Sequence, residues 1–326
     1  MLVAVTGASG HVGANLVRAL LARGDRVRVL VHDDARGIEG LDVERVVGDV
    51  RNADSLRPFV RGVDRVFHMA AKISLDPKDG PLLEAINVGG VRNVAEACLA
   101  EKVRMVHTSS IHALSSEPMD KTIDETRPLA SGPRALPYDR SKAAGERVIA
   151  EVAQKGLDVV TVNPTAVLGP HDFRPSHMGE VLLDLYHGRL PGLVDGAFDW
   201  VDVRDVVAGA LAASEKGRRG ERYLLGGAHR TVPELAKIVA EVTGRRAPRL
   251  VSPMWLARGV APFATVFAKI ANRRPLFTSA SLTALSNHRS VSHAKAEREL
   301  GYTSRPLVDT IRDTFAWFRE AGMLES

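Results

Sequence analysis

The stretch MLVAVTGASGHVG at residues 1–13 decides the fold of this chain. The apolar run Leu2–Val5 predicts a buried strand, and the apolar spacing of Val12–Ala22 predicts the helix that follows it. Glycines between the two allow a tight turn, in which free backbone N–H groups and the positive end of the helix can face a pyrophosphate. A glycine loop at this place predicts a dinucleotide-binding unit, although an ordinary turn selects glycine as well.

We expect the loop and the first helical turn to bind the cofactor through backbone groups. Gly13, one turn into the helix, should let that helix pack close to the sheet. The predicted cofactor contacts from this stretch are Gly7, Ser9, Gly10, His11, Val12 and Gly13.

The first half of the chain alternates short apolar runs with helical patterns. The predicted strands are Leu2–Val5, Arg26–Val31, Arg45–Val47, Arg65–His68, Arg104–His107 and Asp158–Val162. The predicted helices are Val12–Ala22, Ser55–Arg61, Leu82–Ala100 and Leu136–Gln154. Several strands are almost continuously apolar, which is typical of parallel sheets buried on both faces. The alternation predicts a doubly wound parallel α/β sheet, the Rossmann architecture.

The pattern changes after Asn163, where Pro and Gly become frequent and later segments are mostly helical. We therefore predict a dinucleotide-binding domain at residues 1–165 and a smaller, mostly helical region at residues 166–326 that binds substrate. Residues 198–215 have a strand-then-helix pattern and are expected to return to the main sheet.

The composition excludes several classes of protein. The 326 residues are 45% apolar and 25% charged, which is typical of a globular chain. The net charge is +5, but the longest basic runs are pairs such as Arg218-Arg219, unlike the dense stripe of a nucleic-acid-binding protein. A single cysteine, Cys98, forms no internal disulfide, and no Cys/His spacing suggests a metal site. No signal peptide and no run of about 20 apolar residues is present, so we expect a cytoplasmic protein without stable membrane insertion.

Two further motifs carry chemistry. Tyr138 and Lys142 stand four residues apart in a predicted helix, so their side chains share one face. A phenol with a pKa of about 10 is a poor acid or base at neutral pH unless a nearby ammonium stabilises its anion. The cluster Thr108-Ser109-Ser110 ends a strand at the carboxyl edge, where open α/β sheets bind ligands. A solvated Tyr/Lys helix pair is the alternative interpretation.

Together, the spacing G-x-x-G-x-x-G, the T-S-S cluster and the Y-x-x-x-K pair resemble the extended branch of the short-chain dehydrogenase/reductase superfamily. That branch includes sugar-nucleotide epimerases, 3β-hydroxysteroid dehydrogenases and dihydroflavonol 4-reductases. The chain is most similar to its dihydroflavonol 4-reductase-like and hopanoid-associated sugar epimerase-like groups. The resemblance implies that Ser110 orients a substrate oxygen, Tyr138 exchanges a proton with it, and Lys142 lowers the pKa of Tyr138.

The resemblance also implies cofactor contacts further along the chain. Family members hold the adenine with an Asp after the third strand, and small residues after the fourth strand admit the cofactor backbone. Lys72 matches a lysine that contacts phosphate or ribose, and the sequence NPT at residues 163–165 is similar to a stretch near the nicotinamide. The contacts implied in this way are Asp49, Val50, Ala70, Ala71, Lys72, Thr108, Tyr138, Lys142 and Pro164.

The choice between NAD and NADP depends on the tip of the second strand. A carboxylate there accepts from the ribose 2′-OH of NAD, whereas a cation suits the 2′-phosphate of NADP. By resemblance to the reductases, His32 takes the position of their NADP-selecting Arg, which favours NADP. Asp33 and Asp34 follow directly and keep NAD open.

These features predict an NAD(P)-dependent reductase or dehydrogenase that acts on a ketone/secondary-alcohol pair of a mid-sized, partly apolar molecule. A nucleotide-sugar epimerase or dehydratase with tightly bound NAD is the first alternative, and Phe198 stands where such enzymes usually carry an Arg. A cofactor-sensing regulator without catalysis is the second alternative. Resemblance to the branch also implies a homodimer.

Two segments of the second half are predicted to approach ligands. Arg174, in a loop expected to line the active site, either grips an anionic group or is a solvated cation. Apolar residues recur at helical spacing between Trp255 and Ile270, with basic residues around them. That pattern is typical of a helix with one buried face, of a wall of an apolar pocket, or of a stripe on a membrane surface.

Overall fold

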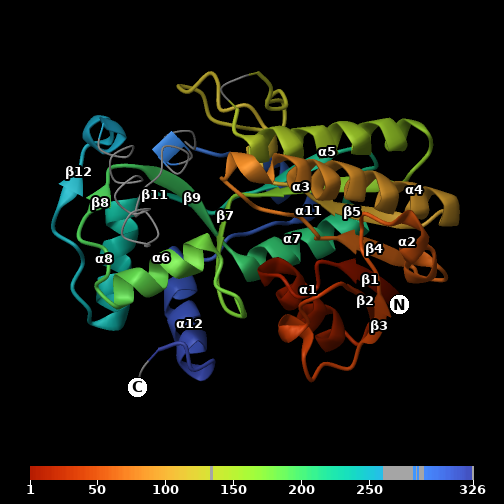
Figure 1. Ribbon diagram of the computed structural model, residues 1–326, viewed down its shortest axis with the longest axis horizontal. Coiled ribbons are helices and arrows are strands. Elements are labelled where there is room, and N and C mark those ends of the chain that lie inside the picture. The colour runs from red at the N-terminus through yellow and green to blue at the C-terminus, as the bar shows by residue number, and fades with distance from the viewer. Residues whose placement is uncertain (133–134, 260–281, 284, 286–289, 325–326) are drawn as a thin grey trace.

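The main sheet of the computed structural model has seven parallel strands in the order β10-β6-β5-β4-β1-β2-β3 (Figure 1). The structure describes residues 1–132, 135–259, 282, 283, 285 and 290–324. The strands are β1 (Leu2–Thr6), β2 (Arg26–Val31), β3 (Glu44–Val47), β4 (Arg65–His68), β5 (Arg104–Thr108), β6 (Val159–Pro164) and β10 (Arg222–Leu225). The predicted doubly wound sheet is confirmed. Its strand order reverses between β1 and β4, where α/β sheets of this kind bind ligands.

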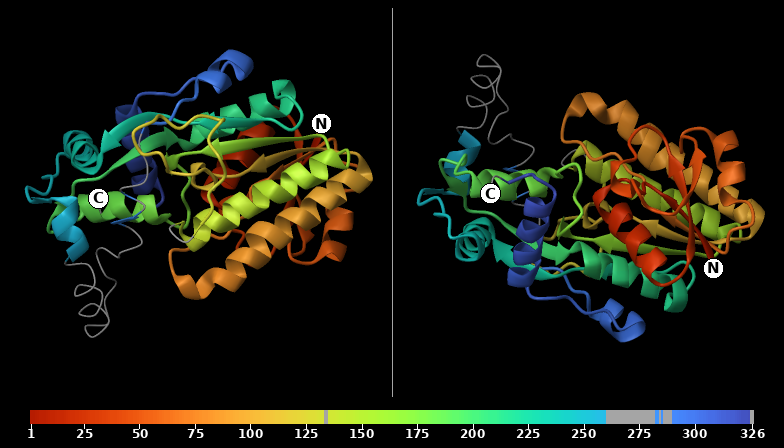
Figure 2. Two further views of the ribbon diagram at one scale, coloured as in Figure 1. Left: turned by 90° about the horizontal axis from the view of Figure 1, so that it is seen from above. Right: turned by 90° about the horizontal axis from the view of Figure 1, so that it is seen from below.

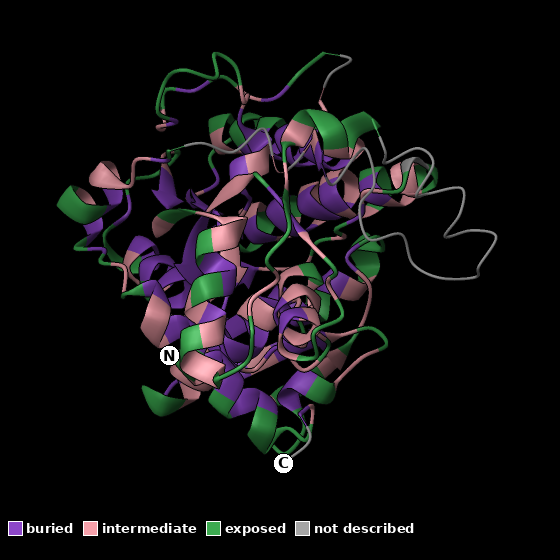
Figure 3. Cartoon of the chain, turned by 90° about the vertical axis from the view of Figure 1, so that its left-hand side faces the viewer, coloured by how far each residue is buried: buried purple, intermediate pink, exposed green. Residues whose placement is uncertain are grey.

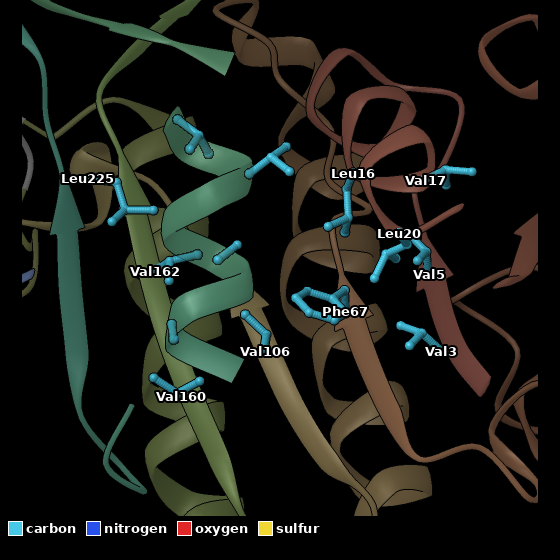
Figure 4. Packing of buried hydrophobic residues seen from close by; sticks show 14 of the residues in the cluster. Val3, Val5, Leu16, Val17, Leu20, Phe67, Val106, Val160, Val162 and Leu225 are labelled. Atoms are coloured by element: carbon cyan, nitrogen blue, oxygen red, sulfur yellow. The ribbon is translucent and has the colours of Figure 1, made fainter. Parts of the chain in front are cut away.

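Helices cover both faces of this sheet. One face is covered by α1 (His11–Ala22) and α7 (Val203–Lys216), and the other by α2 (Ala53–Val60), α4 (Val91–Glu101) and α5 (Pro137–Gln154). Figure 4 shows the first layer, in which Leu16 and Leu20 of α1 pack with Phe67 of the sheet. Side chains alternate along each strand, so neighbouring residues of a strand enter opposite layers.

The single helix predicted at Leu82–Ala100 is wrong in its middle. The chain forms α3 (Gly80–Glu84), a π-helical turn at Ala85–Gly90, and then α4. Two consecutive glycines weaken the α-helix at this point. The turn has a tertiary reason as well, because it brings the side chain of Asn87 to α5 and the backbone of Gly90 against Val50.

A smaller lobe stands beside the main sheet (Figure 2). Its strands are β7 (Ala166–Leu168), β9 (Ala197–Asp202) and β11 (Ala228–Thr231) in one sheet, and β8 (Leu193–Val194) paired with β12 (Val251–Ser252). Its helices are α6 (His177–Tyr186), α8 (Val232–Thr243) and α12 (Leu307–Glu320). They enclose a core of their own that includes Trp200, Phe315 and Phe318.

The segment predicted to return to the main sheet, residues 198–215, divides between the two lobes. Its strand half is β9, which pairs with β7 and β11 in the smaller lobe, so that part of the prediction is wrong. Its helix half, α7, does pack against the main sheet. The strand that returns is β10, a short apolar run bounded by glycines, and α11 (Ala294–Leu300) lies beside it.

Buried residues lie mainly on the inward faces of helices and strands, and exposed residues on their outer turns (Figure 3). Within the ranges that the structure describes, no helix is both long enough and apolar enough to cross a bilayer. Most of the apolar segment predicted at residues 255–270 lies outside the described residues, which end at Gly259 before resuming at Leu282.

Candidate active site

The glycine loop after β1 is shaped by close backbone contacts. Gly7 has a φ of +67°, and a Cβ there would lie 2.6 Å from the backbone nitrogen of Ala70. A Cβ on Gly13 would lie 2.1 Å from the carbonyl oxygen of Gly7, so helix α1 packs directly on the loop. The prediction that Gly13 allows close packing is confirmed, but its neighbour is the loop and not a strand of the sheet.

Helix α1 begins with an anion site. Its N-cap is Gly10, which offers no side-chain cap to the first N–H groups, including those of His11, Val12 and Gly13. These groups and the helix dipole fit a pyrophosphate. Ser9 donates its hydroxyl to the backbone oxygen of Asp34, 2.5 Å away, and so joins the loop to the segment after β2.

The ring of His11 forms its hydrogen bonds with backbone carbonyls of the protein. Its Nε2 lies 3.2 Å from the carbonyl oxygen of Gly169 and 3.1 Å from that of Pro170. Asn15 donates to the same Pro170 oxygen at 2.9 Å and pairs through Oδ1 with His171 at 3.1 Å. The loop after β7 is therefore fixed to α1, and only the backbone N–H of His11 remains for the predicted cofactor contact.

Charged residues gather at the tips of β2 and β3. His32 lies between two carboxylates, with Nδ1 2.7 Å from Asp33 and Nε2 3.2 Å from Asp49. Asp49 also accepts from Arg51 at 2.8 Å, and Asp34 pairs with Arg36 at 2.6 Å. These residues offer both cations for a phosphate and carboxylates for a ribose.

Two further arginines lie near these charged residues, one in sequence and one in space. Arg28 lies near His32 in sequence, but its guanidinium binds Glu44 at 2.8 Å and backbone carbonyls at the end of α2. Arg174 acts on Asp34, whose pKa falls to about 2 chiefly because Arg36 donates side-chain hydrogen bonds to it, with a smaller charge effect from Arg174. Arg174 is exposed, and its role in gripping an anionic group stays a prediction.

The segment after β4 and helix α5 meet at one polar clamp formed by Asn87. Asn87 receives the N–H of Lys72 at 2.8 Å, donates to the Lys72 carbonyl at 2.9 Å, and donates to the Ser141 hydroxyl at 2.9 Å. Ala70 donates its N–H to Thr6 at 3.2 Å, whereas Ala71 is exposed. The Lys72 ammonium is half-exposed, 3.9 Å from Asp79. The clamp ties the segment after β4 to helix α5.

Val50 lies where the adenine is predicted to bind. It is buried, its carbonyl accepts from Asn93 at 2.9 Å, and a Cβ on Gly90 would lie 2.8 Å from its Cγ2. The π-helical turn thus packs against Val50 and limits where the Val50 side chain can lie.

Ser110, Tyr138 and Lys142 converge at the end of β5. All three are buried, and the Ser110 hydroxyl forms a side-chain hydrogen bond with the Tyr138 phenol. Lys142 donates from Nζ to the Thr108 carbonyl at 3.0 Å. Ser109, the other serine of the cluster, has a buried hydroxyl without a hydrogen-bond partner among the described residues. The predicted choice of Ser110 over Ser109 agrees with this geometry.

Burial dominates the ionisation of this group. It raises the pKa of Tyr138 to about 12, although the hydrogen bond from Ser110 lowers it in part. Burial also lowers the pKa of Lys142 to about 8, against the raising effect of Glu146. The phenol is therefore protonated at neutral pH. Its pKa is raised, whereas the resemblance implied that Lys142 lowers it.

A second row of polar residues supports the triad. Glu146 lies on the same face of α5 as Lys142, one turn further along, and is almost fully buried. It accepts from Asn163 at 2.6 Å and pairs with Arg222 of β10 at 2.9 Å, while Asn163 also donates to the Ser110 carbonyl at 3.0 Å. We did not predict this row, although the spacing of Tyr138, Lys142 and Glu146 at intervals of four residues was a visible signal.

Three histidines surround the triad. His68 and His107 stack at 5.7 Å, and burial holds the pKa of both well below the usual value, so both are neutral. His68 shares a hydrogen bond of 2.7 Å with Thr6. His112 pairs with Asp139 at 2.9 Å, and its ring approaches Tyr138 edge-on with centroids 5.4 Å apart.

The remaining predicted contacts lie at the same edge of the sheet. Thr108 holds the Lys142 ammonium through its carbonyl, and its hydroxyl lies 2.7 Å from the sulfur of Met69. Pro164 is buried at the end of β6, in register with Leu225 of β10. A carbonyl, a phenol and an ammonium thus stand at the end of β5, beside the switch point of the sheet, and β4 separates them from β1 and the start of α1.

Comparison with known proteins agrees with this arrangement. The model of the NAD dependent epimerase/dehydratase family matches residues 3–226. The chain belongs to this family. It is 41% identical to sterol demethylase protein B of Methylococcus capsulatus, over 99% of this chain and 100% of that protein. A Synechocystis protein named as a dihydroflavonol 4-reductase is 34% identical over 99% of this chain and 96% of its own length.

A solved structure extends the comparison. The dTDP-glucose 4,6-dehydratase of Streptomyces venezuelae, with NAD bound, superposes with a TM-score of 0.81 at 25% identity and covers 100% of this chain and 99% of its own. The predicted class of this epimerase/dehydratase family member, a nicotinamide-dependent oxidoreductase, is confirmed.

Proposed function

We propose that this enzyme reduces a ketone on an apolar, ring-containing molecule, with NADPH as the reductant. The observation that carries the proposal is the buried triad, in which a protonated phenol bonded to Ser110 faces the carboxyl edge of the sheet. A phenol with a raised pKa holds its proton at neutral pH and can donate it to a carbonyl oxygen that gains negative charge.

Each residue of the triad has one task in this reaction. Ser110 donates its hydroxyl to the substrate oxygen and holds it against the phenol. Tyr138 transfers the proton to that oxygen, and the ammonium of Lys142 stabilises the phenolate that remains. A bound nicotinamide supplies the hydride that the carbonyl carbon receives. The product is a secondary alcohol.

The relatives support the class of substrate. The protein that is similar over its whole length carries the name of a sterol demethylation protein, and the other relative is named as a reductase. The molecules in these two names, a sterol and a dihydroflavonol, both have fused rings and few charges. The absence of an Arg at position 198, where Phe stands, weakens the case for a nucleotide sugar.

The charged tip of β2 supports the preference for NADPH. Arg36 and Arg51 supply two cationic side chains within this group, each paired with a neighbouring carboxylate, and the ring of His32 lies between Asp33 and Asp49. A 2′-phosphate competes for such exposed cations better than a hydroxyl does. We expect the ratio of kcat/KM for NADPH to that for NADH to exceed one, and Arg36→Ala to lower it about tenfold. A strong preference for NADH would contradict this.

The reaction itself is tested by substituting the phenol. The purified protein is assayed for NADPH oxidation with a panel of cyclic ketones that includes 3-ketosteroids. Tyr138→Phe should lower kcat by a factor of about 10² to 10⁴ and should lower the affinity for the cofactor much less. Tyr186→Phe, in α6 of the smaller lobe, is the matched control.

Two outcomes would overturn the proposal. Full turnover by Tyr138→Phe would remove the phenol from the chemistry. Tightly held NAD in the purified protein, with epimerised product and no net cofactor consumption, would favour the epimerase alternative, which the NAD-bound sugar dehydratase of similar fold keeps open.

A further inference from the structure

One long segment of the chain carries charge of a single sign. Residues 242–296 contain nine Lys and Arg residues and no Asp or Glu, whereas the net charge of the whole chain is +5. Outside this segment, acidic residues therefore outnumber basic ones. A segment of this kind attracts an anionic partner.

The described part of this segment combines exposed bases with exposed apolar side chains. Around β12, the exposed fractions are 67% for Leu250, 41% for Val251, 74% for Trp255 and 43% for Leu256. Four arginines of the same stretch are exposed, namely Arg245, Arg246, Arg249 and Arg258. We call these eight side chains the β12 surface.

The exposed residues are not needed to build the core. Residues 254–259 are helical, and the inward side chains Met254 and Ala257 pack with Val194, Leu282 and Leu285. Trp255 and Leu256 therefore belong to the other side of an amphipathic turn. Elsewhere among the described residues, large exposed apolar side chains such as Val47 and Met119 stand singly, which is ordinary, whereas here four lie within seven positions.

We propose that the β12 surface docks this protein on an anionic phospholipid bilayer. Trp and Leu side chains enter the boundary between headgroups and acyl chains, and the surrounding arginines bind the phosphates and the negative surface potential. Figure 1 shows β12 at the outer edge of the smaller lobe, at the opposite end of the molecule from α2. The proposal holds for any substrate and does not depend on the proposed reaction.

The test uses the full chain and extruded vesicles of phosphatidylcholine with or without one quarter phosphatidylglycerol. At low salt we expect the protein to co-sediment with the anionic vesicles and not with the neutral ones. Two of the three tryptophans, Trp200 and Trp317, are buried, so a blue shift of the emission reports the entry of Trp255 into the bilayer. Trp255→Phe should abolish the blue shift and keep most of the binding.

Charge variants separate the two contributions. Arg246→Glu/Arg249→Glu should lower partitioning by more than about tenfold, since each basic residue near such a surface contributes a factor of about five. Trp255→Ala should lower it several-fold as well. The matched controls are Arg57→Glu/Arg61→Glu on α2 and Met119→Ala, which should bind like the parent protein. Unchanged thermal unfolding shows that each variant is folded.

Three results would overturn the proposal. The first is the absence of binding to anionic vesicles at low salt, and the second is undiminished binding by Arg246→Glu/Arg249→Glu. The third is binding to duplex DNA at the same salt without binding to vesicles, which would mark the surface as a site for a polyanion and not for a membrane.

Discussion

Two polar regions of this protein differ in burial, and the difference separates their tasks. Between α5 and the sheet, the side chains of Glu146 (α5) and Asn163 (β6) are buried and hydrogen-bonded to each other, and Asn163 also donates to the Ser110 carbonyl. At the tip of β2, the side chains of His32 and Arg36 are 52% and 57% exposed, and their ion pairs face solvent. Buried and hydrogen-bonded groups keep one geometry, as catalysis needs. Exposed pairs can exchange partners, as the recognition of a charged cofactor needs.

The pH dependence of reduction tests the buried region most strongly. Burial lowers the pKa of Lys142 to about 8, so its ammonium is lost as the pH rises through that value. We expect kcat/KM to fall about tenfold per pH unit above this point, to about one hundredth of the plateau two units higher.

The control for this prediction is Lys142→Arg. A guanidinium keeps its charge throughout this range, so the alkaline fall should move beyond the measured pH values. An identical fall in the parent and in Lys142→Arg would show that another group titrates.

Removal of the clamp at Asn87 should cost the most stability. Asn87→Ala leaves the backbone N–H and carbonyl of Lys72 without their partner and removes one donor from the Ser141 hydroxyl, which keeps its bond to the Tyr138 carbonyl. Each buried group left unpaired costs about 1–3 kcal/mol, so we expect the free energy of unfolding in urea to fall by about 3 kcal/mol. Asn93→Ala, which loses one bond to the Val50 carbonyl, should cost about 1 kcal/mol. Equal losses would contradict the special place of Asn87.

The contact between Gly90 and Val50 should give a smaller effect. A methyl group on Gly90 would lie 2.8 Å from Cγ2 of Val50, so Gly90→Ala forces the side chain or the π-helical turn to move. Overpacking of this kind costs about 1–3 kcal/mol, and the better helix propensity of Ala returns about 1 kcal/mol. Adding Val50→Ala should remove the cost. A double-mutant cycle without coupling would show that the two positions do not compete for space.

The smallest effect is expected from salt, which should act on the exposed charged side chains at the tip of β2 and not on the buried triad. Raising the ionic strength from about 0.05 to about 0.5 M shortens the screening length severalfold, so the KM for NADPH should rise a few-fold. The kcat should stay constant, because the triad is buried. A parallel fall in kcat would mean that the buried region is also open to salt.

Much of the main sheet could be predicted because strands buried on both faces leave continuous apolar runs. The bounds of Arg26–Val31 and Arg65–His68 are those of β2 and β4. The convergence of Tyr138 and Lys142 could be predicted as well, because helical periodicity alone places them on one face. Their roles in catalysis stay predictions.

Contacts between distant segments could not be predicted in the same way. The ring of His11 binds a loop more than 150 positions away, and Glu146 meets Arg222 only because β10 joins the sheet. The sequence did indicate basic residues beside the apolar positions of residues 255–270, but the full length of the segment without acids, residues 242–296, was not part of that prediction.

The attachment of the loop after β7 to α1 has a mechanical consequence. His11 and Asn15 of α1 hold the carbonyls of Gly169 and Pro170, on the helix whose first turn is predicted to bind the pyrophosphate. A hinge motion at the junction of the two lobes would break these hydrogen bonds. We therefore expect any opening of the protein to take place beyond residue 171, within the smaller lobe, while α1 and the loop after β7 move together.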